Sequence, residues 1–380
     1  MRCDFSPPLL PARLNMADQE RTRWVVKIGS SLLADEGLGL NEEAIRQLVE
    51  QVATLRTRAI DVVLVSSGAI AAGMLRLGWR ARPHELHRLQ VAAAVGQSGL
   101  VKTYESCFNR HGITSCQVLL TDADLANRSR YLNARSALIT MLDLDLVPIV
   151  NENDTVVTHE IQFGDNDTLA ALVTNLVDAA CLVILTDQDG LFDADPRHSP
   201  AASLIKDAIA GDSALEKVAG PGDVYGRGGM LTKVQAAQIA ARSGADTLIV
   251  SGHRPQVLLE LADGHSPGTR IRAAAGRMAA RKQWLAGQLR VAGRVYLDAG
   301  AVKVIRSAGR SLLPVGVIRV EGTFERGELV ACVDAAGRQE IARGLINYGA
   351  ADAEKIIGRA SDEIETVSYT HLTLPTILLV

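Results

Sequence analysis

The sequence contains few cysteines, and they are not arranged for cross-linking or for zinc. Five of them are scattered over 380 residues, at positions 3, 107, 116, 181 and 332, without a C-x-x-C pair. Neither a disulfide framework nor a structural zinc site is therefore indicated. We expect a reducing, cytoplasmic environment.

Long apolar runs are also missing. The longest, residues 169–186, is interrupted by Asn175 and Asp178, so it does not match a membrane-spanning helix. The first twenty residues contain three prolines and no signal-peptide pattern. We expect residues 1–20 to form a disordered extension, with Met16 as an alternative start, and we expect no membrane partner.

Neither sign of charge dominates the chain. With 40 basic and 43 acidic residues the net charge is −3, so no overall field attracts the protein to nucleic acid or to an anionic membrane. The composition, 47% hydrophobic and 22% charged, is that of a globular protein. The length is typical of two or three domains.

The phosphate loop G-x-x-x-x-G-K-[ST] is absent, but a weaker candidate is present. Residues 226–233 read Gly-Arg-Gly-Gly-Met-Leu-Thr-Lys. Glycines let the backbone approach an anion, and a helix starting near Met230 would point its free N–H groups at it. Considered alone, such a turn is more commonly a plain helix-entry loop.

Short apolar runs alternate with helical patterns over the first two thirds of the chain. The strands that we expect are residues 24–29, 61–65, 114–120, 146–150, 181–186 and 247–250. This alternation predicts an α/β domain whose parallel sheet is covered on both faces by helices. Right-handed crossovers place the loops that follow the strands along one edge.

The pattern changes near residue 268. Residues 268–292 contain six basic and no acidic residues, which we interpret as a basic linker with a helix. Short β-type runs follow at residues 293–297, 301–305, 315–320, 328–332 and 341–345. Their spacing predicts a small β-barrel domain at 293–365. The apolar tail, residues 366–380, has no assignable partner and fits an artefact at least as well as a strand.

Two polar clusters lie on either side of a short loop in the centre of the chain. Asn151–Asp154 follows an expected strand, and Asp165–Asp167 precedes an expected helix. A helix cap requires one such residue, not seven. Side chains of this kind at the carboxyl end of a strand predict a pocket for a small charged molecule. The alternative is a solvated loop with a good cap.

A lysine occupies an unusual position at the end of the first strand. Lys27 is followed by Ile-Gly-Ser-Ser, and burial of an unpaired ammonium group costs several kcal/mol. It therefore requires an anion, either a protein carboxylate or a ligand phosphate. Two lysines, two glycine turns and a carboxylate cluster meet the requirements of phosphoryl transfer, which depends on positioning and on neutralising phosphate oxygens.

Eight segments together resemble the glutamate 5-kinases of the amino-acid kinase superfamily. They are Lys27–Ser31, Ser66–Ala69, Ala92–Gln97, Tyr131–Arg135, Asn151–Asp154, Gly164–Asp167, Leu185–Gln188, and Gly228–Met230 with Lys233. The resemblance implies a three-layer αβα amino-acid kinase fold with a mainly parallel sheet at residues 21–267. It also implies that the barrel at 293–365 is a PUA-like domain.

The resemblance also implies an activity. Members of this family use ATP and Mg²⁺ to phosphorylate the side-chain carboxylate of L-glutamate to L-glutamyl 5-phosphate, the first step of proline biosynthesis. We therefore expect feedback inhibition by proline, a homo-oligomer (dimer or tetramer), and no metal ligands from the protein itself.

Matching the motifs position by position implies roles for individual residues. Lys27 and Lys233 would contact the transferring phosphoryl group, with Asp167 holding both lysines in place. The glutamate-binding residues would be Ser67, Asp154 and Asn166. The nucleotide-binding residues would be Lys27, Thr186, Asp187, Arg227, Gly228, Gly229, Met230, Leu231, Thr232 and Lys233. Arg227 departs from the family, in which a threonine or another small residue is expected.

The chemistry of the residues agrees with these roles. A glutamate side chain, with a pKa near ~4.3, is already ionised at neutral pH, so no general base is required. The obstacle is repulsion between the carboxylate and the γ-phosphate, roughly 1 kcal/mol at 4 Å in water and about 4 kcal/mol at a dielectric of 20. Cations must offset that repulsion.

Two other functions remain open. The same fold serves other carboxylate or carbamate kinases and uridylate kinases. A PUA-like barrel is also compatible with an RNA-binding protein, but residues 291–365 contain ten basic and eleven acidic residues. RNA binding favours a basic surface, so we do not expect RNA as a partner.

Overall fold

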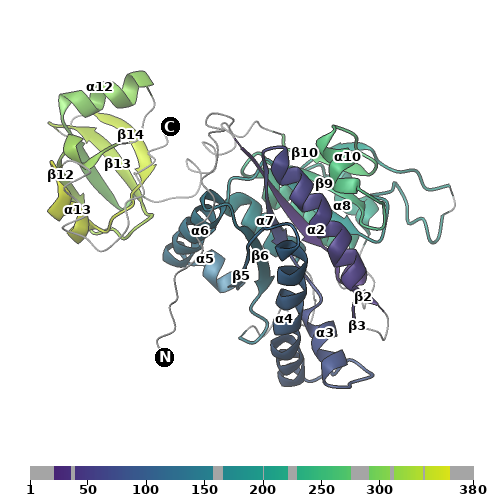
Figure 1. Ribbon diagram of the computed structural model, residues 1–380. Helices are drawn as coiled ribbons and strands as arrows, with labels where there is room; N and C mark the ends of the chain where they lie inside the picture. Colours follow the sequence, from purple (N-terminus) through teal and green to yellow (C-terminus); the bar gives the residue numbers. More distant parts are fainter. Residues whose placement is uncertain are drawn as a thin grey trace, which may run out of the picture.

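The computed structural model describes residues 21–35, 39–156, 166–199, 201–220, 229–274, 291–308, 312–336 and 339–359. These residues form an eight-stranded sheet with helices on both faces and a separate four-stranded sheet nearer the C-terminus (Figure 1). The expectations for residues 1–20 and 366–380 lie outside the described residues. In the described part, no helix is both long enough and apolar enough to span a membrane.

The large sheet has the strand order β5-β6-β4-β1-β7-β9-β10-β8. Its strands are β1 Thr22–Ile28, β4 Ile60–Val65, β5 Ser115–Leu120, β6 Val147–Glu152, β7 Cys181–Thr186, β8 Asp207–Ile209, β9 Asp246–Ser251 and β10 Thr269–Arg272. All neighbours pair in parallel except β9 with β10. The predicted mainly parallel α/β architecture is confirmed. A two-stranded ribbon, β2 Ala34–Asp35 with β3 Gly39–Leu40, lies apart from it.

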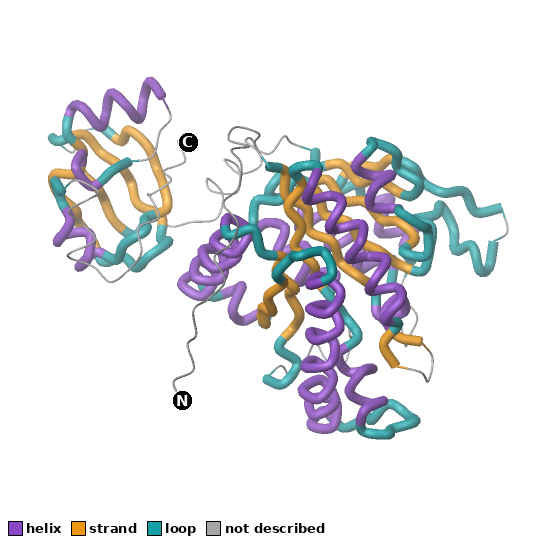
Figure 2. Tube along the Cα trace, in the orientation of Figure 1, coloured by secondary structure: helices purple, strands orange, loops and turns teal. Residues whose placement is uncertain are grey.

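Helices cover both faces of this sheet, as Figure 2 shows. One core contains residues of α1 Ser30–Leu33, α2 Glu42–Thr57, α3 Ala69–Arg76, α4 Leu86–Asn109 and α10 Val257–Ala262. The other contains residues of α5 Asp122–Ala126, α6 Arg128–Asp143, α7 Asp167–Leu176, α8 Ser213–Ala219 and α9 Met230–Ala241. The three-layer arrangement follows from strands that are apolar on both faces.

The alternation of side chains along β1 determines which layer meets Lys27. Val26 and Ile28 belong to the core on the α2 side, whereas Val25 belongs to the core that contains α7 and α9. Because successive residues of a strand face opposite sides, Lys27 faces the same layer as Val25. The strand therefore directs the lysine toward α7 and α9.

Helices α3 and α4 are in backbone contact. A Cβ atom on Gly73 would lie 1.7 Å from the carbonyl oxygen of Ala92, and one on Gly96 would lie 1.8 Å from that of Ala69. No other residue leaves room for this approach. The contact fixes the start of α3, and with it the turn that follows β4, against the middle of α4.

The beginning of the stretch that we interpreted as a linker belongs to the sheet. Thr269–Arg272 forms β10, which pairs with β8 and β9. Thr269 and Ile271 are buried, whereas Arg270 and Arg272 are exposed. The linker interpretation is therefore wrong for these four residues, because alternate burial leaves the two arginines on the solvent side. The helix expected further along, in residues 275–290, lies outside the described residues.

The C-terminal sheet has the order β12-β11-β13-β14. Its elements are β11 Gly293–Leu297, α12 Ala299–Ala308, a 3₁₀ turn at Pro314–Gly316, β12 Val317–Gly322, β13 Leu329–Asp334, β14 Glu340–Leu345 and α13 Ala350–Ile356. The strand predicted at 301–305 is wrong, because these residues lie in α12. The Asp298 carboxylate accepts a hydrogen bond from the backbone N–H of Ala301 at 2.7 Å, and this cap starts the helix.

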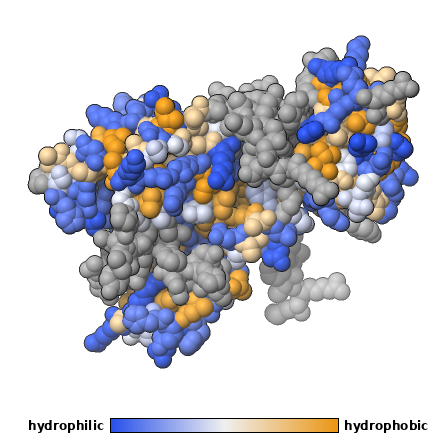
Figure 3. Space-filling model, turned by 180° about the vertical axis from the view of Figure 1, so that it is seen from behind, coloured by the Kyte–Doolittle hydropathy of each residue, from blue (hydrophilic) through white to orange (hydrophobic). Residues whose placement is uncertain are grey.

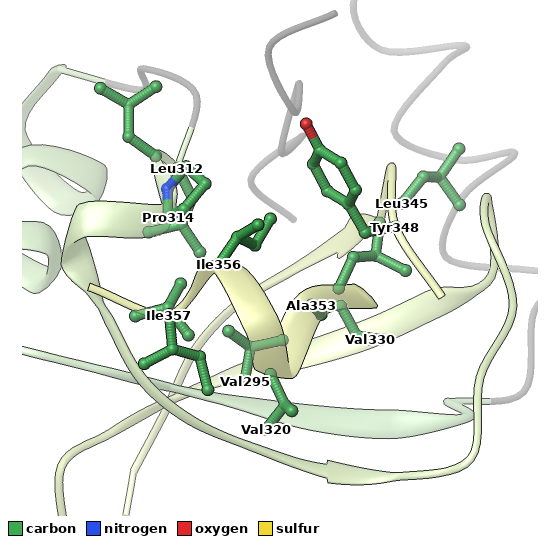
Figure 4. Close-up of a pocket in the computed structure, with 13 residues that line it drawn as sticks. Val295, Leu312, Pro314, Val320, Val330, Leu345, Tyr348, Ala353, Ile356 and Ile357 are labelled. Carbon is green, nitrogen blue, oxygen red and sulfur yellow. The ribbon is translucent and has the colours of Figure 1, made fainter. Parts of the chain in front are cut away.

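Apolar side chains of the C-terminal domain line a pocket, which Figure 4 shows. Val295, Val320, Val330 and Ile356 gather from three strands and α13. On the outside of the molecule, hydrophilic and hydrophobic residues intermix over the face shown in Figure 3. Val295, Val330 and Ile356 also belong to the hydrophobic core of this domain.

Candidate active site

Three charged residues that are distant in sequence meet beneath the carboxyl end of the large sheet. Asp167 lies 2.5 Å from the Nζ atom of Lys27 through Oδ1 and 3.0 Å from that of Lys233 through Oδ2. Asp167 is completely buried, and each lysine is 4% exposed. The structure therefore brings together the three residues to which a role in phosphoryl transfer was assigned.

The position of Asp167 favours its charged form. It is the first residue of α7, where the helix dipole stabilises a negative charge. Burial raises the pKa of Asp167, but the two ammonium groups beside it outweigh this effect, and the net shift is downward. The carboxylate is thus ionised at neutral pH and acts as a fixed bridge between two cations, not as a base.

The glycine turn before α9 joins this cluster. The hydroxyl of Thr232 lies 3.0 Å from Oδ2 of Asp167 and 2.7 Å from the carbonyl oxygen of Gly229. Lys233 follows directly on α9, which begins at Met230 as expected. The helix start is thereby anchored to the carboxylate.

A second, uncharged cluster adjoins the first. Asn166 is the N-cap residue of α7, yet its side chain makes no capping hydrogen bond. Its Nδ2 donates to the carbonyl oxygen of Ser66 at 2.5 Å and lies 3.5 Å from Oγ of Ser67. Two of the expected glutamate-binding residues, Ser67 and Asn166, are thus side by side. Because the side chain of Asn166 does not cap the helix, the alternative of a solvated loop with a good cap does not explain this residue.

Two residues without an expected role complete the uncharged cluster. Oδ1 of Asn151 accepts from Nδ2 of Asn166 at 2.9 Å, and Nδ2 of Asn151 donates to Oε1 of Gln97 at 2.8 Å. Asn151 is 2% exposed. Both residues lie in motifs that carried the family resemblance, so that resemblance was the signal available. The individual positions of Gln97 and Asn151 in the sequence gave no other indication that they belong to the site.

Asp154 lies in the turn after β6 and is set apart from the lysines. Burial raises its pKa to about 6, and the positive charge of Arg82 only partly opposes the shift. A carboxylate in this condition gains from a cationic partner. No hydrogen bond joins Asp154 to Ser67 or Asn166 in the described part of the chain, so the structure does not link it directly to the other two expected glutamate-binding residues.

The expected nucleotide-binding residues are only partly described. Thr186, at the end of β7, is buried, and its hydroxyl donates to Oδ1 of the exposed Asp187 at 3.0 Å. Gly229, Met230 and Leu231 are half-buried at the start of α9. The remaining two positions of this set, 227 and 228, lie outside the described residues. Strand β7 is adjacent to β1, so Thr186 is at the same edge of the sheet as Lys27.

Comparison with protein families identifies both parts of the chain. Residues 22–251 match the model of the amino acid kinase family, and residues 293–368 match the PUA domain. Among solved structures, the UMP kinase from Ureaplasma parvum has a TM-score of 0.48 at 15% identity, over 67% of this chain and 100% of its own. That value is too low to support an assignment.

Comparison with curated proteins is more specific. A glutamate 5-kinase from Chromohalobacter salexigens is 61% identical over 343 residues, which is 90% of this chain and 90% of that protein. A glutamate 5-kinase from Ralstonia nicotianae is 60% identical over 91% of this chain and 92% of its own length. The chain therefore belongs to the amino acid kinase family and, within it, to the glutamate 5-kinases, with a PUA domain on its C-terminal side.

Proposed function

We propose that this protein transfers the γ-phosphoryl group of ATP to the side-chain carboxylate of L-glutamate, forming L-glutamyl 5-phosphate in the first step of proline biosynthesis. The observation that carries the proposal is the buried contact of Lys27 and Lys233 with one carboxylate. Two ammonium groups held within hydrogen-bonding distance of Asp167 suit a transferring phosphoryl group, whose charge is spread over three oxygens.

The step requires no proton transfer. An oxygen of the substrate carboxylate attacks the γ-phosphorus, a new O–P bond forms, and the bond to the bridging oxygen breaks with its electron pair leaving on ADP. The nucleophile is ionised at neutral pH. Lys27 and Lys233 offset the repulsion between the two anions, and because Asp167 fixes them beforehand, they need not reorganise during the reaction.

The uncharged cluster is our proposed binding site for glutamate. Ser67 and Asn166 offer a hydroxyl and an amide at the start of α7, one residue from Asp167. Asp154 would pair with the substrate ammonium group, which accounts for the presence of a carboxylate whose pKa is raised by burial. Thr186, Asp187 and the 227–233 loop would bind ATP.

Mg²⁺ would be bound mainly by the nucleotide. Both oxygens of Asp167 are in contact with lysines, and the described residues contain no group of three or more potential metal-ligating side chains. Mg²⁺ in kinases is commonly bound by phosphate oxygens and water with one or two carboxylates. We propose that it enters with ATP and neutralises the β- and γ-phosphates.

Three further features belong to the same proposal. We propose feedback inhibition by proline, a homo-oligomer, and a location in the cytoplasm. The last is supported by the cysteines at 107, 116, 181 and 332, which are free thiols, as is usual in a reducing compartment.

The decisive experiment measures ADP release with a panel of acceptors, with hydroxylamine present to trap an acyl phosphate. We expect turnover and hydroxamate formation with L-glutamate, and neither with aspartate, N-acetylglutamate or UMP. N-acetylglutamate lacks the ammonium group that Asp154 would bind. Turnover with aspartate, N-acetylglutamate or UMP in place of glutamate would contradict the proposed substrate.

A further inference from the structure

Helix α4 directs two polar side chains toward the uncharged cluster. Gln97 and Tyr104 are seven residues apart, which is two helical turns, so they lie on one side of the helix. Leu100, between them, is completely buried. Each of the two reaches a different segment of the proposed glutamate site.

Gln97 reaches Asn166 through Asn151, and the orientation of each amide is determined. The carbonyl oxygen of Ser66 can only accept, so the atom of Asn166 facing it must be Nδ2. That nitrogen also donates to Oδ1 of Asn151, which accepts as well from the backbone N–H of Glu152 at 2.9 Å. Nδ2 of Asn151 must then donate to Oε1 of Gln97.

This chain of amides has a free donor at one end. Nε2 of Gln97 is buried and has no hydrogen-bond partner among the described residues. A buried donor without an acceptor is unfavourable. Satisfaction of both polar atoms therefore does not explain why a glutamine occupies this position. What it contributes is the acceptor oxygen for Asn151. At the other end, the side-chain hydrogen bonds of Asn166 within the described residues all involve Nδ2, which leaves Oδ1 for a donor such as an ammonium group.

Tyr104 reaches the second segment. Its hydroxyl lies 3.1 Å from Oγ of Ser66, and Oγ of Ser66 donates to the carbonyl oxygen of Ser67 at 3.2 Å. With the serine hydrogen used in that bond, Tyr104 is the donor to Ser66. Burial raises the pKa of Tyr104, so it keeps its hydrogen. The backbone N–H of Ser66 donates to Val150 at 2.9 Å.

We propose that Gln97 and Tyr104 are positioning residues for the acceptor substrate. Gln97 acts through Asn151 on Asn166, and Tyr104 acts through Ser66 on Ser67. The inference rests on the proposed function, because it assumes that Ser67 and Asn166 bind the acceptor. It assigns α4 a role that the lysine cluster does not share, since neither Gln97 nor Tyr104 bonds to Lys27, Lys233 or Asp167 in the described structure.

The backbone contact between α3 and α4 makes this role physically reasonable. Gly96, next to Gln97, abuts Ala69, which is the first residue of α3 and directly follows the Ser66–Gly68 turn. A helix held this closely offers little freedom to slide. The side chains of Gln97 and Tyr104 therefore extend from a backbone that is held in place, as is required of groups that orient others.

The experiment compares steady-state kinetics of the full-length protein and three single variants. Gln97→Met removes the acceptor oxygen at nearly constant volume, Gln97→Glu keeps an acceptor there, and Tyr104→Phe removes only the hydroxyl. We expect the KM for glutamate to rise about tenfold in Gln97→Met and about threefold in Tyr104→Phe, with the KM for ATP unchanged. In Gln97→Glu most of the affinity for glutamate should be retained.

A matched control separates positioning from loss of stability. Leu89 is buried on the same helix and its side chain has no atom that can hydrogen-bond to the amides or to Tyr104, so Leu89→Ala should lower the thermal unfolding midpoint without changing either KM. Equal KM values in Gln97→Met and the wild type would overturn the proposal for Gln97. An equal rise in Gln97→Met and Gln97→Glu would also overturn it, because the acceptor oxygen would then be irrelevant.

The design also distinguishes this inference from the proposed function. The KM is measured for whichever acceptor the wild-type protein phosphorylates. If that acceptor is not glutamate, the proposed substrate is wrong, and the same comparison of variants still tests whether Gln97 positions the acceptor side. A parallel rise in the KM values for ATP and acceptor would show a general effect of α4 and would contradict the inference.

Discussion

The two halves of the site lie next to each other in sequence, at Asn166 and Asp167, but differ in their physics. The half around Asp167 consists of full charges in a dry environment, with both lysines 4% exposed. The half around Asn166 consists of neutral amides and hydroxyls, linked in a chain to α4. Charges are suited to stabilise a transferring phosphoryl group, and oriented dipoles are suited to select an acceptor.

The difference predicts two kinds of damage. Loss of a charge from the first half removes an interaction that is strongest in the transition state, and it should lower kcat. Loss of a dipole from the second half removes an interaction already made with the bound substrate, and it should raise the KM. A variant of the first half that raised only the KM, or a variant of the second half that lowered only kcat, would refute the assignment of the two halves.

The largest effect is expected for Lys233→Ala. Without this ammonium group the phosphoryl oxygens lose one of two protein cations, and kcat should fall by about 10²- to 10³-fold while the KM for glutamate changes little. Lys217→Ala, on exposed α8, is the matched control and should behave as the wild type. A near-normal kcat in Lys233→Ala would remove this lysine from the reaction.

Asp167→Asn should affect stability as well as turnover. The substitution leaves two buried ammonium groups without their shared carboxylate, so the free energy of unfolding should fall by about 3–5 kcal/mol at pH 7. Because the pKa of Asp167 is lowered in the folded state, its stabilisation is present above the ordinary aspartate pKa and is lost as the pH falls below about 4. The difference between variant and wild type should therefore shrink in acid.

Chemical denaturation at pH 7 and at pH 3 measures that difference. A variant as stable as the wild type at pH 7 would mean that the lysines find other partners. In that case the description of Asp167 as the bridge between them would be wrong.

For the charged half, the residues alone predicted that Lys27 requires an anion, and the family resemblance implied that Asp167 holds both Lys27 and Lys233. Lys27 is the last residue but one of an apolar strand, and Asp167 begins an apolar helix. Neither can be buried alone at acceptable cost, so a shared site is the simplest solution. The right-handed crossovers between parallel strands separately predicted that the loops after the strands would lie along one edge.

The neutral half could not be predicted in this way. Gln97 and Asn151 would be equally acceptable on the surface, since the cost of exposing an amide to water is small. They are also 54 residues apart in the sequence, so nothing local indicates that they bond to each other. Only the folded structure, in which α4 packs against α3 and β5, shows that they meet. The strand expected at 301–305 failed for a related reason, because its apolar residues suit either a strand or the capped helix α12 that forms.

The smallest and most specific effect concerns Asp154. Its folded-state pKa is raised to about 6 by burial, so as the pH falls through 6 the carboxylate is protonated and can no longer pair with an ammonium group. The KM for glutamate should rise by about tenfold between pH 7.5 and pH 5, with kcat changing less. In Asp154→Asn the KM should be high throughout and independent of pH over this range.

The same shift has the opposite consequence for stability. A carboxyl group with a raised folded-state pKa favours the folded protein most below its ordinary pKa, and this contribution is lost as the pH rises through 6. Without substrate, Asp154→Asn should thus be more stable than the wild type at pH 8, by about 1–2 kcal/mol. A residue that lowers the stability of the substrate-free protein but raises its affinity for the substrate is expected to serve substrate recognition. If Asp154→Asn changed neither the KM nor the stability at pH 8, Asp154 would have no part in the acceptor half, and selection of the acceptor would depend on the amides and hydroxyls alone.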